Sequence, residues 1–222
     1  MGISRFGSKI LILSAIEKLA LRFVVLTSPN RDDLPDGGAS HYAHIVTQIK
    51  TRFPDVKVEV LIPDFKGHVS DLKTVIEAFP DVVNHNLETV PSLYPTVRRG
   101  SIYSRSLTLL TEMKNVNPFL LTKTGLMVGL GETYDELKAV FEDIQKARVD
   151  IVTIGQYLKP DKTSLDVVRY YDLEEFETLR TMAEKSGIRY VFSGPLVRSS
   201  FLAEHVFEDL HKKDASFAAA LA

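Results

Sequence analysis

The sequence predicts an α/β protein, a parallel β-sheet with alternating helices, and three observations carry this prediction. Short apolar segments alternate about six times with longer segments whose apolar residues recur at helical spacing. The connections between them are short, which is typical of parallel β-α-β units. Polar residues follow every predicted strand, which favours an open partial barrel with one shared mouth over the alternative, a flat doubly wound sheet.

Six segments are expected to form the strands, and each runs into a polar or glycine-containing loop. The segments are residues 23–27, 56–62, 81–83, 118–128, 150–158 and 189–194. Helices with one apolar face are expected around them, at residues 14–22, 40–53, 70–79, 107–113, 133–144, 172–183 and 201–213. Three of these helices have a capping residue at their start, namely Ser40, Thr133 and Asp172.

The stretch over residues 122–132 combines a buried strand with a glycine turn. Gly129 and Gly131 cannot continue a regular strand, and Thr133 with Glu136 gives a capping-box signature for the next helix. A glycine turn at the carboxyl end of a parallel strand lets a flat ligand approach the backbone closely. A turn that needs glycine only for tight packing accounts for the pattern equally well.

Composition excludes several classes of protein. The 222 residues are 45% apolar and 25% charged, which is ordinary for one large globular domain or two small ones. A net charge of -2 gives no electrostatic case for a nucleic-acid partner, and no apolar stretch is long enough to span a membrane. The chain has no cysteine, so it offers no thiolate for a disulfide, a zinc finger or an iron–sulfur cluster.

Polar residues at the carboxyl ends of the strands are expected to line one cavity. They are Ser28, Arg31, Asp64, Asn84, Asn86, Glu88, Lys123, Gly125, Gln156, Arg198 and Ser199. Cations suit a carboxylate, and amides and acids suit hydroxyls and an amine, so the set favours a zwitterionic, sugar-bearing ligand. In the alternative reading, Asn84 and Glu88 cap the following turn and Lys123 pairs with Glu132.

Several motifs, in this order and spacing, resemble the lipoyl synthase family of radical S-adenosylmethionine enzymes from about residue 20 to residue 204. The matching stretches are Leu-Thr-Ser at 26–28, Arg-Asp-Asp-Leu at 31–34, Asp-Gly-Gly at 36–38, Asn-His-Asn-Leu-Glu-Thr-Val at 84–90, Lys-Thr-Gly-Leu-Met-Val-Gly-Leu-Gly-Glu at 123–132, Gly-Gln-Tyr-Leu at 155–158 and Gly-Pro-Leu-Val-Arg-Ser-Ser at 194–200. Residues 125–132 are also similar to the adenine-side motif of radical S-adenosylmethionine barrels, with Met127 in place of an isoleucine.

The resemblance implies a partial (β/α)6 TIM-like barrel with S-adenosylmethionine at its mouth. It implies two 4Fe-4S clusters, the second of them ligated in part by Ser199 or, less favourably, by Ser200. It also implies insertion of two sulfur atoms into an octanoyl chain carried by a lipoyl-domain protein or a glycine-cleavage H-type protein, in the cytoplasm or, in a eukaryote, in mitochondria. The residues then expected to bind S-adenosylmethionine are Ser28, Arg31, Asn84, Asn86, Glu88, Lys123, Gly125, Gly129, Glu132, Gln156 and Arg198.

The chain departs from the family in one essential respect, because the family's cysteine triplets belong before Ala20 and this chain has neither. The barrel is therefore expected to lack its first strand, which leaves an open edge at residues 23–27 that residues 10–13 could partly fill. The expected organisation is a non-matching segment over 1–20, the barrel over 21–213 and a disordered tail over 214–222. Three explanations stay open: a fragment of a true lipoyl synthase, one half of a split enzyme completed by a cysteine-bearing N-terminal half, or a pseudoenzyme that binds S-adenosylmethionine or a lipoyl domain without catalysis.

Overall fold

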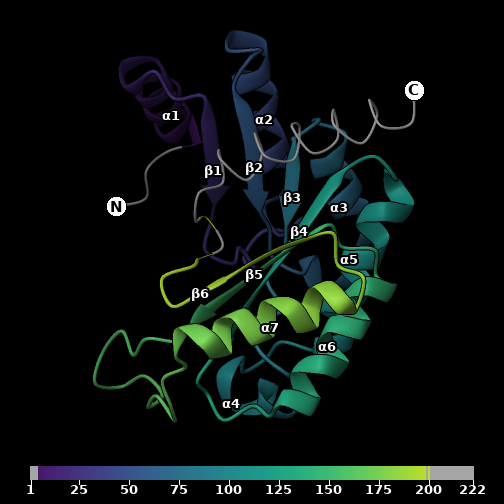
Figure 1. Ribbon diagram of the computed structural model, residues 1–222. Helices are drawn as coiled ribbons and strands as arrows, with labels where there is room; N and C mark the ends of the chain where they lie inside the picture. The colour runs from purple at the N-terminus through teal and green to yellow at the C-terminus, as the bar shows by residue number, and fades with distance from the viewer. Residues whose placement is uncertain (1–4, 199, 201–222) are drawn as a thin grey trace, which may run out of the picture.

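The protein forms a single parallel sheet of six strands, and its computed structural model describes residues 5–198 and 200. The strands lie side by side in the order of the sequence, as Figure 1 shows. They are β1 (Phe23–Thr27), β2 (Lys57–Leu61), β3 (Val82–Asn84), β4 (Leu121–Val128), β5 (Ile151–Gln156) and β6 (Tyr190–Gly194). All six predicted strands are confirmed.

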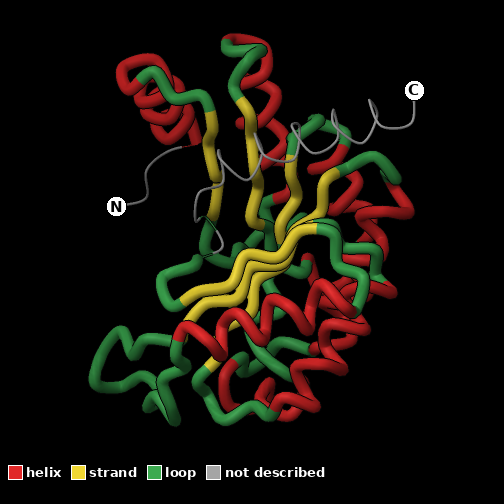
Figure 2. Tube along the Cα trace, in the orientation of Figure 1, coloured by secondary structure: helices red, strands yellow, loops and turns green. Residues whose placement is uncertain are grey.

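The sheet is strongly twisted and remains open. In Figure 2 the strands β1 to β3 run in a clearly different direction from β4 to β6, so the sheet curls as a partial barrel does. Within the described residues β1 pairs only with β2 and β6 only with β5, which leaves both as edges. The predicted partial barrel with an open edge at residues 23–27 is thus confirmed.

Helices connect successive strands and cover the outside of the sheet, with α5, α6 and α7 along one side in Figure 1. They are α1 (Arg5–Leu19), α2 (Ala39–Arg52), α3 (Val69–Ile76), α4 (Tyr94–Val97), α5 (Tyr103–Val116), α6 (Tyr134–Lys146) and α7 (Leu173–Lys185), with short 3-10 helices at Phe65–Gly67 and Pro91–Leu93. The capping boxes predicted at Thr133 and Asp172 are both present, at the starts of α6 and α7.

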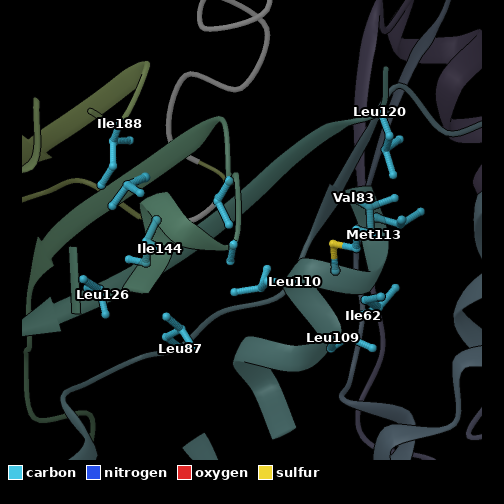
Figure 3. Close-up of a cluster of buried hydrophobic side chains, with 14 of the residues drawn as sticks. Ile62, Val83, Leu87, Leu109, Leu110, Met113, Leu120, Leu126, Ile144 and Ile188 are labelled. Carbon is cyan, nitrogen blue, oxygen red and sulfur yellow. The ribbon is translucent and has the colours of Figure 1, made fainter. Parts of the chain in front are cut away.

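The core lies between the sheet and these helices. In Figure 3, Val83 of β3 and Leu126 of β4 face Leu110 and Met113 of α5 and Ile144 of α6. All five side chains are at most 3% exposed. Their burial fixes the helices against the sheet, and that in turn fixes the polar loops at the carboxyl ends of the strands.

Three expectations about the elements were wrong or fall outside the described residues. Residues 10–13 lie inside α1 and do not pair with β1; Ile12 and Leu13 pack against the core from that helix. Ser40 is not the cap of α2, since the helix begins at Ala39 and Gly38 precedes it with a left-handed φ of 91°. The helix and tail expected over residues 201–222 lie outside the part of the chain that the structure describes.

Over residues 5–198 and 200, the helices are too short or too polar for any of them to cross a bilayer.

Candidate ligand-binding site

A polar cavity of about 580 Å³ opens at the carboxyl ends of β1, β2 and β3. Three residues predicted for the ligand site line it, namely Ser28, Asn86 and Glu88. Asp64, predicted at the same mouth, lines it as well. The cavity also has a cationic side that the sequence analysis did not assign to the site, formed by Lys66, Arg98, Arg99 and Arg105.

Asn86 and Glu88 form the centre of this cavity. The Asn86 amide donates to Glu88 Oε1 at 3.0 Å, while Asn86 Oδ1 is buried and has no hydrogen-bond partner. A buried acceptor without a partner is costly, and a ligand donor would remove that cost. Gly125 makes room for this side chain, because a Cβ at Gly125 would lie 2.9 Å from Asn86 Oδ1.

Glu88 is held in an unusual backbone conformation, with a φ of 67° that non-glycine residues adopt at a cost. Its neighbours hold it there: the Glu88 amide donates to the Gly125 carbonyl at 2.9 Å, and Met127 donates to the Glu88 carbonyl at 2.7 Å. Burial raises the pKa of the Glu88 carboxyl, partly offset by the Asn86 hydrogen bond and the nearby Arg98 guanidinium. In this conformation Glu88 is one of the residues that line the cavity.

His85 lies in the wall of the cavity and is a structural residue. Its Nδ1 donates to the Ile62 carbonyl at 2.9 Å, so its Nε2 accepts from the Ser106 hydroxyl, also at 2.9 Å. Burial lowers the pKa of this imidazole to about 4, and it is neutral at physiological pH. A neutral, fully bonded imidazole is not a proton carrier near neutral pH.

Lys123 is buried inside β4 and does not line the cavity, which corrects its predicted place at the end of a strand. It is the third residue of β4 and pairs in register with Asn84, the last residue of the much shorter β3. Its ammonium group forms an ion pair with Glu59 of β2 at 3.0 Å, and the Asn84 amide donates to the same carboxylate at 3.1 Å. The alternative pairing with Glu132 was also wrong.

The sequence analysis missed Glu59, although a signal for it existed. It is a charged residue between two valines in the middle of β2, and it is 1% exposed. A charge in a buried strand needs a charged partner, and the Lys123 side chain supplies it from β4, although in register Lys123 lies level with Leu61 of β2. The pair leaves the Lys123 ammonium unavailable to a ligand, while Asn84 Oδ1 stays without a partner.

A second group of predicted residues, at the carboxyl ends of β4 and β5, forms hydrogen bonds within the group and to the neighbouring backbone. Glu132 accepts from the backbone amides of Gly129 and Leu130, at 2.6 and 2.9 Å, and from the Tyr171 hydroxyl at 2.9 Å. Burial and the Glu132 charge raise the pKa of Tyr171 to about 12, so its hydroxyl stays a donor.

Gln156 belongs to the same network. Its amide donates to the carbonyls of Tyr157 and Arg169, at 3.0 and 3.1 Å, and accepts from the Tyr171 amide at 3.0 Å. Gly129 must be a glycine here, because a Cβ would lie 2.6 Å from the Arg169 carbonyl and closer still to the Gln156 amide. These residues hold down the loop that follows β5, and their predicted contact with a ligand stays a prediction.

The remaining predicted residues lie away from the cavity or outside the described chain. Arg31 forms a two-pronged ion pair with Asp33, at 2.7 and 2.6 Å, and does not line the cavity. Arg198 donates to its neighbouring Val197 carbonyl at 2.9 Å. Ser199 lies outside the described residues, and Ser200 is an exposed turn residue.

Comparison with known proteins defines the class to which this fold and site belong. Residues 3–144 match the radical SAM superfamily. The fold is similar to that of methylornithine synthase, with a TM-score of 0.55 and 14% identity. That similarity covers 77% of this chain and 56% of methylornithine synthase. A chitinase domain from Pyrococcus furiosus has a similar fold, with a TM-score of 0.51 and 10% identity over 84% of this chain and 68% of that chain. The chain is therefore a member of the radical SAM superfamily.

Within that superfamily the chain belongs to the lipoyl synthase family. It is 48% identical to the lipoyl synthase of Caldicellulosiruptor bescii over 91% of this chain and 70% of the relative. It is 49% identical to that of Caldanaerobacter subterraneus subsp. tengcongensis over 87% of this chain and 68% of the relative. The predicted family is thus confirmed by both comparisons.

The residues present fit S-adenosylmethionine but do not fit an iron–sulfur cluster. The cavity offers an unpartnered amide oxygen, carboxyl groups and guanidinium groups, which suit the hydroxyls, ammonium and carboxylate of that ligand. The 222 residues include no cysteine, and in residues 5–198 and 200 no three histidine or acidic side chains gather as a metal site would require.

Proposed function

We propose that this chain supplies the ligand-binding barrel of a lipoyl synthase, with S-adenosylmethionine held in the cavity at the ends of β1, β2 and β3. The carrying observation is Asn86, which lines a polar cavity in a chain of this family and has a buried Oδ1 with no hydrogen-bond partner. A ribose hydroxyl donates to such an acceptor, and the neighbouring Glu88 carboxyl accepts from a second donor of the ligand. Arg98 provides the charge that a ligand carboxylate requires.

Bound S-adenosylmethionine supplies the adenosyl group from which this superfamily makes its radical. The substrate, an octanoyl chain, is carried by another protein. A cluster must deliver the electron for that chemistry, and cluster iron is held by thiolates. This chain has none, so no radical step is assigned to its residues. Its own residues bind and orient the ligand, and the closed β4–β5 side shapes the mouth.

The thiolates of a working enzyme would then come from a segment outside these 222 residues. We place that segment at the edge of β1 that no described strand covers, where Thr27 and Ser28 lead directly into the cavity. A strand that pairs there in parallel would end at the same mouth, since the carboxyl ends of parallel strands share one edge of a sheet. A cysteine-bearing half of a split enzyme is one source of such a strand.

Reconstitution with iron and sulfide, followed by calorimetry with S-adenosylmethionine, tests the proposal. The chain is expected to hold no cluster, to make no 5′-deoxyadenosine and to bind S-adenosylmethionine weakly, because no cluster iron chelates the ligand. Iron–sulfur absorbance with matching iron content would refute the first part, and absence of any ligand binding would refute the second.

The absence of cysteine also favours a second candidate, a binding protein that keeps the pocket without catalysis. A cysteine-bearing first-strand segment, added in trans during reconstitution, separates the two. Recovery of a cluster and of 5′-deoxyadenosine supports the enzyme. Ligand binding that persists while neither appears supports the binding protein.

A further inference from the structure

The cavity carries more positive charge than its own carboxylates neutralise. Four cationic side chains line it, against the three acidic side chains of Asp32, Asp64 and Glu88. Asp64 accepts from Arg105 Nε at 2.6 Å, and Asp32 lies 3.3 Å from the Lys66 ammonium. Burial raises the pKa of the Glu88 carboxyl, and the charge of the nearby Arg98 guanidinium partly offsets this rise. Of the four cations, Arg99 therefore has no ion pair or hydrogen bond within the described residues.

Arg98 and Arg99 differ in depth. Arg98 is half-buried and donates to the Asn86 carbonyl at 2.8 Å, with its guanidinium 5.6 Å from the centre of the Tyr94 ring. Arg99 is exposed on the rim of the same cavity, and no hydrogen bond or ion pair holds it within the described chain. The inner arginine is therefore part of the cavity wall, and the outer one faces whatever reaches the mouth.

The tight turn that follows keeps both arginines at the rim. Ser101 donates to the Arg98 carbonyl at 2.9 Å, and Gly100 adopts a φ of 83° with open space where a Cβ would be. In the part of the chain that the structure describes, no atom lies within 4 Å of a Cβ placed on Gly100, so a partner can approach this turn. An exposed guanidinium on such a rim pairs well with a carboxylate because its planar fork matches both oxygens.

We propose that Arg99 forms a docking point for a carboxylate side chain on the protein that carries the octanoyl group. This inference rests on the proposed function, in which the acyl chain arrives on a lysine of another protein. The chain then prefers acylated lysines with an acidic neighbour. The rim position favours a carboxylate of the carrier over that of S-adenosylmethionine, because Arg99 lies outside the wall formed by Asn86, Glu88 and Arg98.

Two labelled peptides test the inference with the full 222-residue chain. Both carry an octanoyl-lysine, one flanked by aspartates and the other by asparagines at the same positions. By fluorescence anisotropy at low salt, the unaltered chain should bind the acidic peptide about three- to tenfold more tightly, the range for one exposed charge pair or two. The preference should shrink as salt is added.

Arg99→Ala is the informative variant because no described contact within the protein depends on this side chain. It should abolish the preference while leaving calorimetric binding of S-adenosylmethionine unchanged. Lys138→Ala is the matched control: Lys138 is an exposed cation on α6 that does not line the cavity, and its loss should leave the preference intact.

Three results would overturn the inference. The first is equal binding, or no binding, of the two peptides, and the second is an equal effect of Arg99→Ala and Lys138→Ala on the preference. The third is loss of S-adenosylmethionine binding in Arg99→Ala while the peptide preference is retained. The last would assign Arg99 to the cofactor. If the unaltered chain binds no S-adenosylmethionine yet its peptide preference depends on Arg99, docking is supported and the proposed cofactor role fails.

Discussion

The two halves of the barrel mouth treat their polar residues in opposite ways. At the ends of β4 and β5, Glu132 and Gln156 use their oxygens and amide on groups of the same chain. At the ends of β1 to β3, Asn86 keeps a buried oxygen without a partner, and Arg99 forms no ion pair within the described residues. Polar residues at strand ends are therefore of two kinds, those that build the mouth and those left free for a ligand.

The largest effect is expected at the buried ion pair between the halves. Lys123→Met should lower the free energy of unfolding by about 3–5 kcal/mol, because it leaves the buried Glu59 carboxylate without its cation. Urea unfolding followed by circular dichroism measures this. Lys138→Met removes an exposed cation instead and should change stability by no more than about 0.5 kcal/mol. A mild effect of Lys123→Met would mean that the pair is not sequestered.

A glycine-to-alanine substitution should lower stability more at the ends of β4 and β5, where the polar groups bond to one another, than at the rim of the cavity at the ends of β1 to β3. Gly129→Ala is expected to cost about 2–4 kcal/mol, since its Cβ would overlap the Arg169 carbonyl and the Gln156 amide at a φ of 101°. Gly100→Ala has a similar φ of 83° but open space around it, so only backbone strain of about 1 kcal/mol is expected. Thermal unfolding of both variants compares them, and equal losses would show that packing at Gly129 is loose.

His85 gives the open half a dependence on pH. Its pKa is about 4 in the folded chain, below the usual value of 6.5, so the unfolded chain binds the proton first as pH falls. Stability is therefore complete above about pH 6.5 and decreases toward pH 4, with a loss of about 2 kcal/mol between pH 7 and pH 5. Unfolding of the unaltered chain and of His85→Gln at both pH values isolates this contribution. The same pH slope in both chains would refute it.

Much of this architecture could be predicted from local patterns. The six strands and the capping boxes at Thr133 and Asp172 each depend on a few consecutive residues. The Glu59–Lys123 pair could not be placed in that way, because it depends on register. β3 is three residues long and β4 is eight, so the last residue of β3 lies beside the third residue of β4. The prediction assumed that all strands end at the same height in the sheet, and this assumption placed Lys123 wrongly at the mouth.

The partners of Gln156 show the same limit in another form. They are backbone groups in the loop up to Tyr171, and nothing in the local sequence reveals where that loop folds back. Arg98 and Arg99 were visible as a basic turn, but only the fold brings them beside Asn86. Pairings between distant segments, which decide which polar groups stay free, require the three-dimensional structure.

A comparison of Asn86→Ala with Gln156→Ala tests the distinction between the halves most directly. For each variant, calorimetry measures binding of S-adenosylmethionine and urea unfolding measures stability. Asn86→Ala should weaken binding about tenfold and cost only about 1 kcal/mol of stability, because its Oδ1 has no partner within the described residues and only the hydrogen bond from its amide to Glu88 is lost. Gln156→Ala should cost about 2–3 kcal/mol of stability, because three buried hydrogen bonds are lost, and leave binding unchanged. The reverse result, with binding lost in Gln156→Ala and kept in Asn86→Ala, would place the ligand on the other half of the mouth and contradict this account.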